Sequence, residues 1–164
     1  MNLSTKSRYG VRILTDIALH QSEGPVQNSD IAKRQDISLQ YVVQILRLLK
    51  SDHLVTTVRG PKGGHVLAVS PSKITCGRLV RLLETHSDLV RCGPNAKVCK
   101  RSKDCQVRLV WMEATQSLFD KLDSVTIADL ADRIQSASKE TCPRERGRSP
   151  ARTSRRLRSV IAQE

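Results

Sequence analysis

Apolar residues recur at intervals of three and four residues in several separate stretches before residue 135, as expected for helices with one buried face. The first stretch has an apolar stripe of Val11, Leu14 and Ile17, and either Ser4 or Thr5 is its expected N-cap. The pattern therefore predicts a mainly α fold. The predicted helices cover residues 3–21, 29–36, 38–50, 72–86, 105–122 and 126–134.

After Lys50 the apolar period changes to two, and this change predicts a small β-hairpin. Its strands are Leu54–Val58 and Val66–Val69, and the glycine-rich tip between them carries Arg59 and Lys62. The preceding helix begins after an N-cap at Ser38 and buries one face. That face consists of Tyr41, Val42, Ile45, Leu48 and Leu49. Two helices followed by a basic hairpin predict a winged helix-turn-helix, whose second helix enters a major groove while the wing meets phosphates or the minor groove.

An ordinary αα-hairpin joined to a β-hairpin would show the same periodicity. The charge of the chain is therefore needed to distinguish a winged helix-turn-helix from this alternative. The 164 residues include 28 Lys and Arg against 16 Asp and Glu, and the net charge is +12 at pH 7. This balance favours a polyanionic partner, nucleic acid before membrane. Two Tyr, one Trp and one Phe are too few for the stacking platforms of single-strand binders, so double-stranded DNA is the expected partner.

Other classes of protein are disfavoured by what the sequence lacks. No stretch approaches the roughly 20 apolar residues of a membrane span, and the N-terminus has no signal-type apolar core. A cytoplasmic protein with reduced thiols is therefore expected. The sequence also offers no paired carboxylates, nucleophile–base set or phosphate-binding Gly-Lys-Ser/Thr loop, so we expect a protein that is not an enzyme.

Cys92, Cys99 and Cys105 lie within 14 residues on a polar stretch that runs into a predicted helix. Because a helix N-terminus favours negative charge, Cys105 should ionise readily. Three thiolates suit an iron–sulfur cluster, a zinc site or a thiol redox switch, and their spacing leaves all three open. Clusters and zinc usually need a fourth ligand. The candidates are Cys76, Cys142, His86 and a residue of a second subunit, although Cys76 is better explained as a small buried hydrophobe.

The predicted helix from Cys105 to Leu122 carries a nearly heptad apolar seam. The seam runs through Val107, Val110 or Trp111, Ala114, Leu118 and Leu122. A second copy of the chain would cover it, so a homodimer is expected, with docking on the chain's own domain as the alternative. The Ser- and Arg-rich stretch at the end is expected to be a disordered tail that attracts phosphate. The predicted divisions are a winged helix-turn-helix over 1–86, a cysteine-rich loop over 87–104, a dimerisation helix and short closing helix over 105–135, and the basic tail over 136–164.

Together these motifs resemble the Rrf2 family of winged-helix transcription regulators, and most closely its IscR-like branch. The resemblance covers roughly residues 1–134 and rests on LSTKSRYGV, ISLQYVVQIL, VRGPKGG, the triple cysteine and TIADL. It implies a homodimer that binds promoter DNA and senses iron–sulfur, oxygen or nitric oxide status through a 2Fe–2S or 4Fe–4S cluster. The implied cluster ligands are Cys92, Cys99 and Cys105. The implied DNA contacts are Ser38, Tyr41, Gln44, Arg59 and Gly60, joined by Gln40 on the same helix and Lys62 on the same basic tip.

Four positions depart from the pattern of that family. In the IscR-like branch a histidine three positions after the third cysteine completes the site, whereas this chain has Arg108, whose guanidinium stays protonated and is a poor ligand. In the nitric-oxide-sensing branch an aspartate of the first helix supplies the ligand, and here that position is Arg8. In the recognition helix, Gln40 replaces a serine and can pair with an adenine edge, while Val43 replaces a glutamate that could accept from cytosine. The preferred operator is therefore expected to differ.

Overall fold

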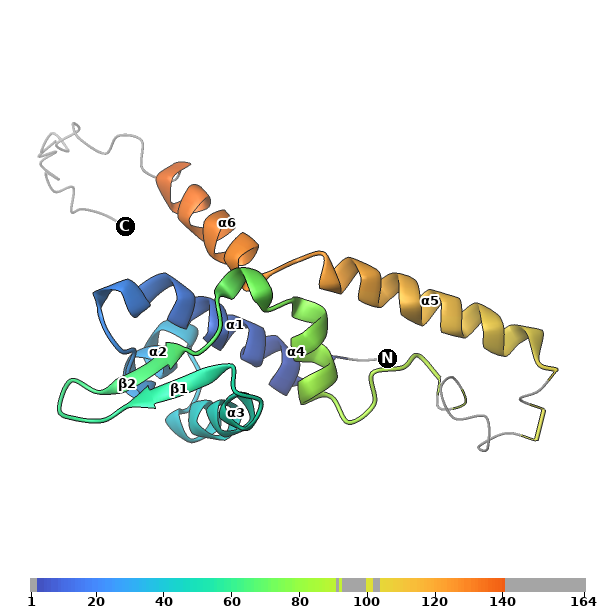
Figure 1. Ribbon diagram of the computed structural model, residues 1–164, viewed down its shortest axis with the longest axis horizontal. Coiled ribbons are helices and arrows are strands. Elements are labelled where there is room, and N and C mark those ends of the chain that lie inside the picture. The colour runs from blue at the N-terminus through green and yellow to red at the C-terminus, as the bar shows by residue number, and fades with distance from the viewer. Residues whose placement is uncertain (1–2, 91, 93–99, 102–103, 141–164) are drawn as a thin grey trace, which may run out of the picture.

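The computed structural model describes residues 3–90, 92, 100–101 and 104–140, and it confirms a mainly helical chain with one two-stranded antiparallel hairpin. Figure 1 shows the elements in order along the chain. The α-helices are α1 (Thr5–His20), α2 (Asn28–Gln35), α3 (Leu39–Ser51), α4 (Cys76–Leu83), α5 (Gln106–Asp123) and α6 (Ile127–Glu140). The strands are β1 (Val55–Val58) and β2 (Gly64–Leu67), and short 3-10 turns lie at Gln21–Glu23 and Pro71–Lys73.

The first helix lies at the centre of the fold, where α1 packs against α2, α3, α4 and α6. Its Ile13, Leu14 and Ile17 are fully buried, together with Ile45 of α3 and Leu79 of α4. Each such side chain contributes about 1.5–3 kcal/mol through removal of apolar surface from water. The core therefore holds α2, α3 and the hairpin in a fixed arrangement around α1.

Several predicted boundaries are wrong. The stretch 72–86 is not one helix, because the Thr75 hydroxyl accepts from the Arg78 amide and starts α4 only at Cys76, and the backbone turns extended at Glu84. The second strand begins at Gly64 and ends at Leu67, because the hairpin register places Gly64 opposite Val58. Residues 136–140, assigned to the basic tail by their composition, continue α6. The rest of that tail, with Cys142, lies outside the described residues.

The buried face of α3 also differs in one position from the predicted one. Leu48 is 39% exposed, whereas Leu46 is buried beside Ile45 and Leu49. The helix turns its core side toward α1 through residues 42, 45, 46 and 49, which follow the three-and-four spacing of one face. Periodicity alone gave the right face, but it assigned the wrong leucine to its edge.

The predicted N-cap residue of the first helix is confirmed as Ser4, but the capping hydrogen bonds come from a distant residue. Ser4 is the N-cap residue of α1, but its side chain makes no capping hydrogen bond. Instead, Glu84 at the end of α4 accepts from the Ser4 amide at 2.7 Å and from the Ser7 hydroxyl at 2.6 Å. Because negative charge at a helix N-terminus is stabilising, this carboxylate ties α4 to the start of α1.

A buried ion pair joins α1 to α2. The Asp16 side chain is 2% exposed and accepts two hydrogen bonds from Arg34, at 2.9 and 2.7 Å, and one from Gln35 at 3.0 Å. A buried carboxylate is tolerated only when its oxygens are satisfied in this way. The pair therefore fixes the orientation of α2, the first helix of the helix-turn-helix.

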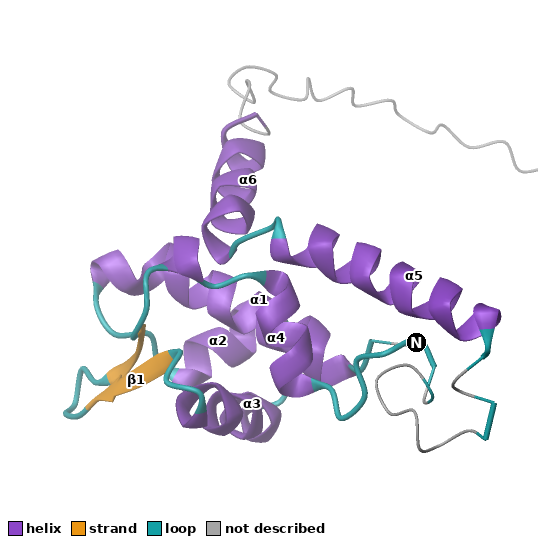
Figure 2. Cartoon of the chain, turned by 45° about the vertical axis from the view of Figure 1, so that its right-hand side comes forward, coloured by secondary structure: helices purple, strands orange, loops and turns teal. Residues whose placement is uncertain are grey.

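Figures 1 and 2 both show α5 extending away from the winged-helix body, with only its C-terminal end beside α4 and α6. The sides of α5 carry large exposed apolar residues: Val107, Leu109, Val110, Trp111 and Met112. At the C-terminal end, Phe119 is buried. Among the described residues, no helix is long and apolar enough to cross a bilayer.

Candidate nucleic-acid interface and cysteine loop

The N-terminal half of α3 presents its polar side chains outward. The Ser38 hydroxyl accepts from the Tyr41 amide at 3.3 Å, which confirms Ser38 as the N-cap of this helix. Gln40 and Gln44 are exposed and lie four residues apart, so they share one face. Their amide groups can both donate and accept, which is the chemistry needed to pair with an adenine edge in the major groove.

Tyr41 is directed toward α1. Its hydroxyl donates to the Thr5 hydroxyl at 2.9 Å, and its ring meets Tyr9 edge to face at a centroid distance of 5.8 Å. The side chain is half-buried against the core. The sequence predicts Tyr41 both as part of the buried face of α3 and as a DNA contact. Its contacts with Thr5 and Tyr9 fit the buried-face prediction. It anchors the recognition helix to α1.

The wing is a tight, anchored hairpin. Gly60 has a φ of 123°, which a residue with a side chain rarely adopts, and the Gly63 amide donates to the Gly60 carbonyl at 2.9 Å. Close to this tip, one residue into β2, Val26 and His65 exchange backbone hydrogen bonds of 2.9 and 2.8 Å. The hairpin is therefore held to the segment before α2 at the end of the strands that adjoins the tip.

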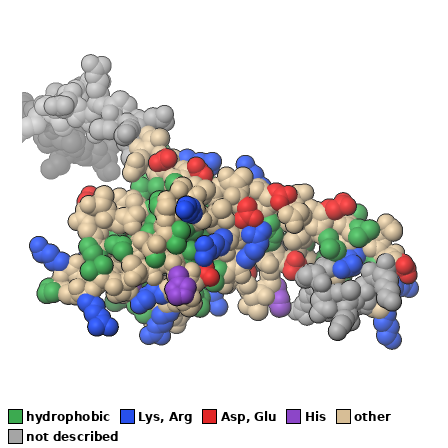
Figure 3. All heavy atoms as spheres, in the orientation of Figure 1, with side chains coloured by type: hydrophobic (Ala, Val, Ile, Leu, Met, Phe, Trp, Pro, Cys, Tyr) green, Lys and Arg blue, Asp and Glu red, His purple; other side chains and the backbone are tan. Residues whose placement is uncertain are grey.

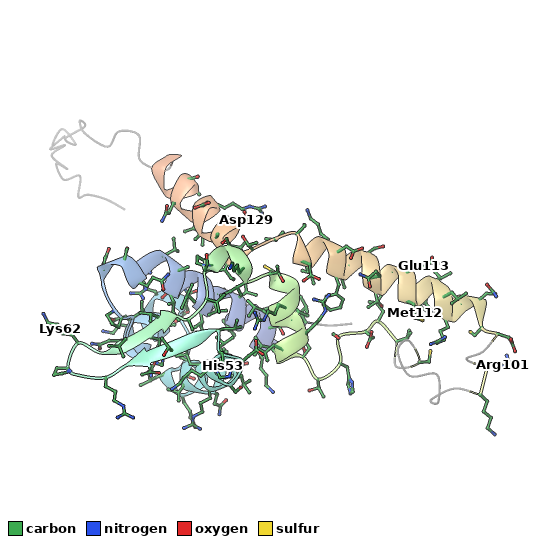
Figure 4. The ribbon with its side chains drawn as sticks, viewed as in Figure 1. His53, Lys62, Arg101, Met112, Glu113 and Asp129 are labelled. Carbon is green, nitrogen blue, oxygen red and sulfur yellow. The ribbon has the colours of Figure 1, made fainter. Side chains whose placement is uncertain are left out.

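Cations surround this end of the molecule. Arg59 and Lys62 of the wing and Arg47 and Lys50 of α3 are all exposed. Figure 4 places Lys62 at the tip of the hairpin, and Figure 3 shows Lys and Arg side chains along the edge formed by the wing and α3. Such a distribution supplies the phosphate attraction that dominates DNA affinity.

An open groove of about 480 Å³ separates α3 from the wing. Leu39 and Val43 line it from α3, and Gly60 and Pro61 line it from the wing. The start of α2 closes its third side with Gln27, Asn28 and Ser29. Backbone amides at a helix N-terminus favour phosphate oxygens, so this third side of the groove is suited to a phosphate group.

The cysteine loop is described only in part. Cys92 and Cys105 are free, partly exposed thiols, and Cys105 is the N-cap residue of α5. Cys99 lies outside the described residues. The Arg108 side chain, at the position of the expected histidine, donates from Nε to the Cys92 carbonyl at 2.7 Å. Within the described part of the chain, no group of three His, Cys, Asp or Glu has a metal-binding arrangement.

Cys76 is not suited to be the fourth ligand from the same chain. It is buried at the start of α4, and burial raises the pKa of its thiol. Its amide donates to the Val125 carbonyl, which places it beside the C-terminal end of α5. Cys105 lies at the other end of this 18-residue helix, about 27 Å away at 1.5 Å per residue. Cys76 is therefore a core residue, as its sequence context predicts.

Known proteins resemble this chain over most of its length. A sequence model of the family described as Rrf2, iron-dependent transcriptional regulator, matches residues 3–133. The chain belongs to the Rrf2 family. It is 39% identical over 142 residues to the protein rrf2 of Nitratidesulfovibrio vulgaris, covering 87% of this chain and 95% of that one. It is 34% identical over 132 residues to the HTH-type transcriptional regulator IscR of Erwinia tasmaniensis, covering 80% and 79% of the two chains.

Solved structures of two Rrf2-type regulators resemble the fold. IscR of T. potens matches with a TM-score of 0.69 and 34% identity over 88% of this chain and 93% of that one. CymR, the global cysteine regulator of B. subtilis, matches with a TM-score of 0.68 and 32% identity over 81% and 98%. DNA-binding transcription regulation is the activity that these comparisons support for the chain.

Sequence reasoning missed two features of this Rrf2 protein. Leu39 is absent from the predicted DNA contacts. Its position four residues before Val43, on the same side of the helix, is the signal that could have found it. The second feature is a contact of Arg81 with Asp123, which joins α4 to the end of α5. The two residues are 42 positions apart, so no local pattern could have indicated it.

Proposed function

We propose that this protein is a homodimeric transcription regulator that binds promoter DNA through α3 and the wing, and that senses iron–sulfur, oxygen or nitric oxide status through a cluster held by Cys92, Cys99 and Cys105. The observation that carries the proposal is the course of α5. Its N-terminal end carries Cys105, and its C-terminal end is joined to α4 of the winged helix. One rigid helix thus connects the cysteine loop with the DNA-reading body.

The donor chemistry supports a cluster with three protein thiolates. Cysteine sulfur is the donor that iron–sulfur clusters use, and Cys105 is the N-cap residue of α5. When bound, the cluster would supply a redox- and nitric-oxide-sensitive group whose loss frees the loop. Arg108 holds the Cys92 backbone and supplies a positive charge near anionic ligands. The fourth ligand is then His86, a residue of a second subunit or one outside the described residues.

Signal transfer from the loop to the DNA follows the contacts of α5. Arg81 donates two hydrogen bonds to Asp123, at 3.0 and 2.7 Å, and its guanidinium lies 4.2 Å from the centre of the Phe119 ring. Thr75 donates to the same carboxylate at 3.0 Å. Gly77 belongs to this junction because a Cβ there would collide with the Asp123 carboxylate. A change in the direction of α5 is therefore passed to α4 and to the core beneath α3.

A second copy of the chain accounts for the apolar sides of α5. Val107, Val110 and Trp111 are 61%, 58% and 44% exposed, and they continue along the predicted seam. A two-fold arrangement would present two winged helices to half-sites about 34 Å apart, one turn of DNA. Cluster ligation at the α5 N-terminus would then bias the spacing of the two recognition helices. Because such a regulator must reach promoter DNA, we propose that it is located in the cytoplasm. We propose no enzymatic role for it.

A thiol switch without a cluster is the second candidate. Cys92 and Cys105 are both partly exposed thiols, and CymR of Staphylococcus aureus, whose structure in an oxidized form is 30% identical with a TM-score of 0.63, matches 80% of this chain. In this alternative, oxidation would join two cysteines of the loop and α5 would carry the signal in the same way. A zinc site on the same cysteines would use the same path.

The deciding experiment is to purify the protein without oxygen, attempt cluster reconstitution, and record the visible spectrum together with iron and sulfide. We expect a charge-transfer band with matching iron and acid-labile sulfide. Cys99→Ala should abolish the band and Cys76→Ala should keep it. A colourless protein with no iron or sulfide after reconstitution would reject the cluster, and zinc content or thiol counts before and after peroxide would then identify the alternative.

A further inference from the structure

The N-terminal turn of α3 presents an apolar pair beside its amide pair. Leu39 is 51% exposed, and Val43 is half-buried one turn further along. Residues four apart lie on the same face of a helix, so the two side chains form one patch. Both line the groove between α3 and the wing, and Gln40 and Gln44 lie on the neighbouring face.

The patch lies among charges that would bring DNA to it. Arg59 and Lys62 are exposed on the wing that forms the opposite wall of the groove, and Arg47 and Lys50 are exposed further along α3. A duplex held by these cations would place the outer surface of α3 in the major groove. The apolar pair would then face a base edge close to the strand that runs through the groove.

We propose that Leu39 and Val43 recognise the 5-methyl group of thymine in the operator half-site, next to an adenine read by Gln40 or Gln44. The inference rests on the proposed DNA-binding function and adds to it the base class that the helix selects. In the major groove, thymine is the base that presents a methyl group, and apolar side chains are its natural contact. Cytosine presents an amine instead, and neither Leu39 nor Val43 can accept its hydrogen bond.

The competing arrangement is packing of the same two side chains on deoxyribose. Sugar contacts would bury Leu39 and Val43 just as well, but they would not depend on the base. Replacement of thymine by uracil removes only the methyl group and leaves pairing and backbone unchanged. Uracil substitution therefore separates the two arrangements.

The test begins with selection of a preferred operator from duplexes with randomised half-sites. Each thymine of the selected half-site is then replaced by uracil, and Kd is measured for the wild-type protein. We expect about a three- to five-fold loss at one or two positions, the factor for burial of one methyl-sized group. The Leu39→Ala and Val43→Ala variants should lose this dependence.

Leu48→Ala is the matched control, because Leu48 is an exposed leucine of the same helix that does not line the groove. It should retain the full uracil penalty. Since Leu39 is half-exposed, its truncation should leave the thermal unfolding midpoint nearly unchanged, which checks that all variants fold. Absence of a uracil penalty at every position, or a penalty that persists in both Leu39→Ala and Val43→Ala, would overturn the inference while specific DNA binding stands. A wild-type protein that selects no sequence would reject both the inference and the proposed function.

Discussion

Arg81 and Asp123 are joined by two parallel hydrogen bonds, one of 3.0 Å from Nη1 to Oδ1 and one of 2.7 Å from Nη2 to Oδ2. The hydrogen bonds from Arg81 are the main cause of a lowered pKa at Asp123, so the pair favours the ionised carboxylate. This pair is where the long helix α5 meets the winged helix, and it is the contact through which we expect the two parts to influence each other.

Arg81→Ala should loosen that junction. The two side chains are 45% and 37% exposed, so the pair itself is worth only about 1 kcal/mol of unfolding free energy. We expect a larger effect on function, namely weaker binding to a two-half-site operator with little change on a single half-site. Titrations of both DNAs, measured by fluorescence anisotropy, provide the comparison.

Arg78→Ala is the control for this prediction. Arg78 forms a similar ion pair with Asp52, with side chains 44% and 35% exposed, but both residues lie within the winged helix. It should cost similar stability and leave the preference for two half-sites unchanged. If Arg78→Ala and Arg81→Ala weaken operator binding equally, the junction does not couple α5 to DNA reading.

Arg34→Ala should destabilise the fold more than any exposed pair. Asp16, which is 2% exposed, would lose its cationic partner and two of its hydrogen bonds and keep only the one from Gln35, and breaking such a pair on one side costs about 2–4 kcal/mol. In urea unfolding, this loss of stability should appear as a lower midpoint concentration of urea. Arg12→Ala, which removes exposed hydrogen bonds to Gln35 of the same helix, should cost less than about 1 kcal/mol. Equal losses in the two variants would contradict the account of α2 docking.

Much of this arrangement is visible in the sequence because it is local. The three-and-four spacing places α1, α3 and α5, and the Thr126 and Asp129 pair closes a reciprocal cap of 2.8 and 3.1 Å at the start of α6. Long-range contacts are not encoded in this way. Glu84 reaches back 80 positions to Ser4, and the Asp123 contact of Arg81 spans 42. Both depend on the packing of α1 and α4, which no local pattern specifies.

Some residues of the candidate site can be predicted from local sequence patterns, and others cannot. Ser38, Gln40 and Gln44 follow from the helix start and the helix period, and Arg59, Gly60 and Lys62 from the glycine-rich tip. The inward direction of Tyr41 does not follow, because it depends on Thr5 and Tyr9 of another helix. The attachment of the wing through Val26 does not follow either, because Val26 lies outside the hairpin.

Arg59→Ala and Lys62→Ala should weaken DNA binding in different ways. If Arg59 reads bases in the minor groove, its truncation should cost about 1–3 kcal/mol on the operator and much less on scrambled DNA. Lys62 at the wing tip should act on phosphate, so its loss should weaken both DNAs alike and reduce the salt dependence by about one ion. Equal losses of Arg59→Ala on operator and scrambled DNA would exclude base reading by the wing arginine.

His65 should make the wing sensitive to acid. The side chain is buried beside Thr57, and burial, with a smaller contribution from Lys50, lowers its pKa below the ordinary 6.5. Above 6.5 both folded and unfolded chains carry a neutral ring, so its contribution to stability is fully present. Below 6.5 the unfolded chain takes up a proton first, and stability falls as the pH approaches the folded-state pKa.

Urea unfolding of wild type and His65→Gln between pH 5 and pH 8, about the range over which histidine titrates, checks this dependence. The difference in stability between the two proteins should shrink as the pH falls. A difference that stays constant over the range would show that His65 does not titrate on unfolding.

We expect the state of the cysteine loop to set the affinity of the protein for DNA. The direct measurement is the Kd of cluster-loaded and cluster-free protein for one selected operator at fixed ionic strength, with Cys99→Ala as a permanently cluster-free reference. We predict a change of about ten-fold or more in either direction, within the usual range of coupling between two sites, and agreement between cluster-free wild type and Cys99→Ala. Identical affinities for the loaded and cluster-free forms would contradict the account, because α5 would then carry no signal from the loop to the recognition helices.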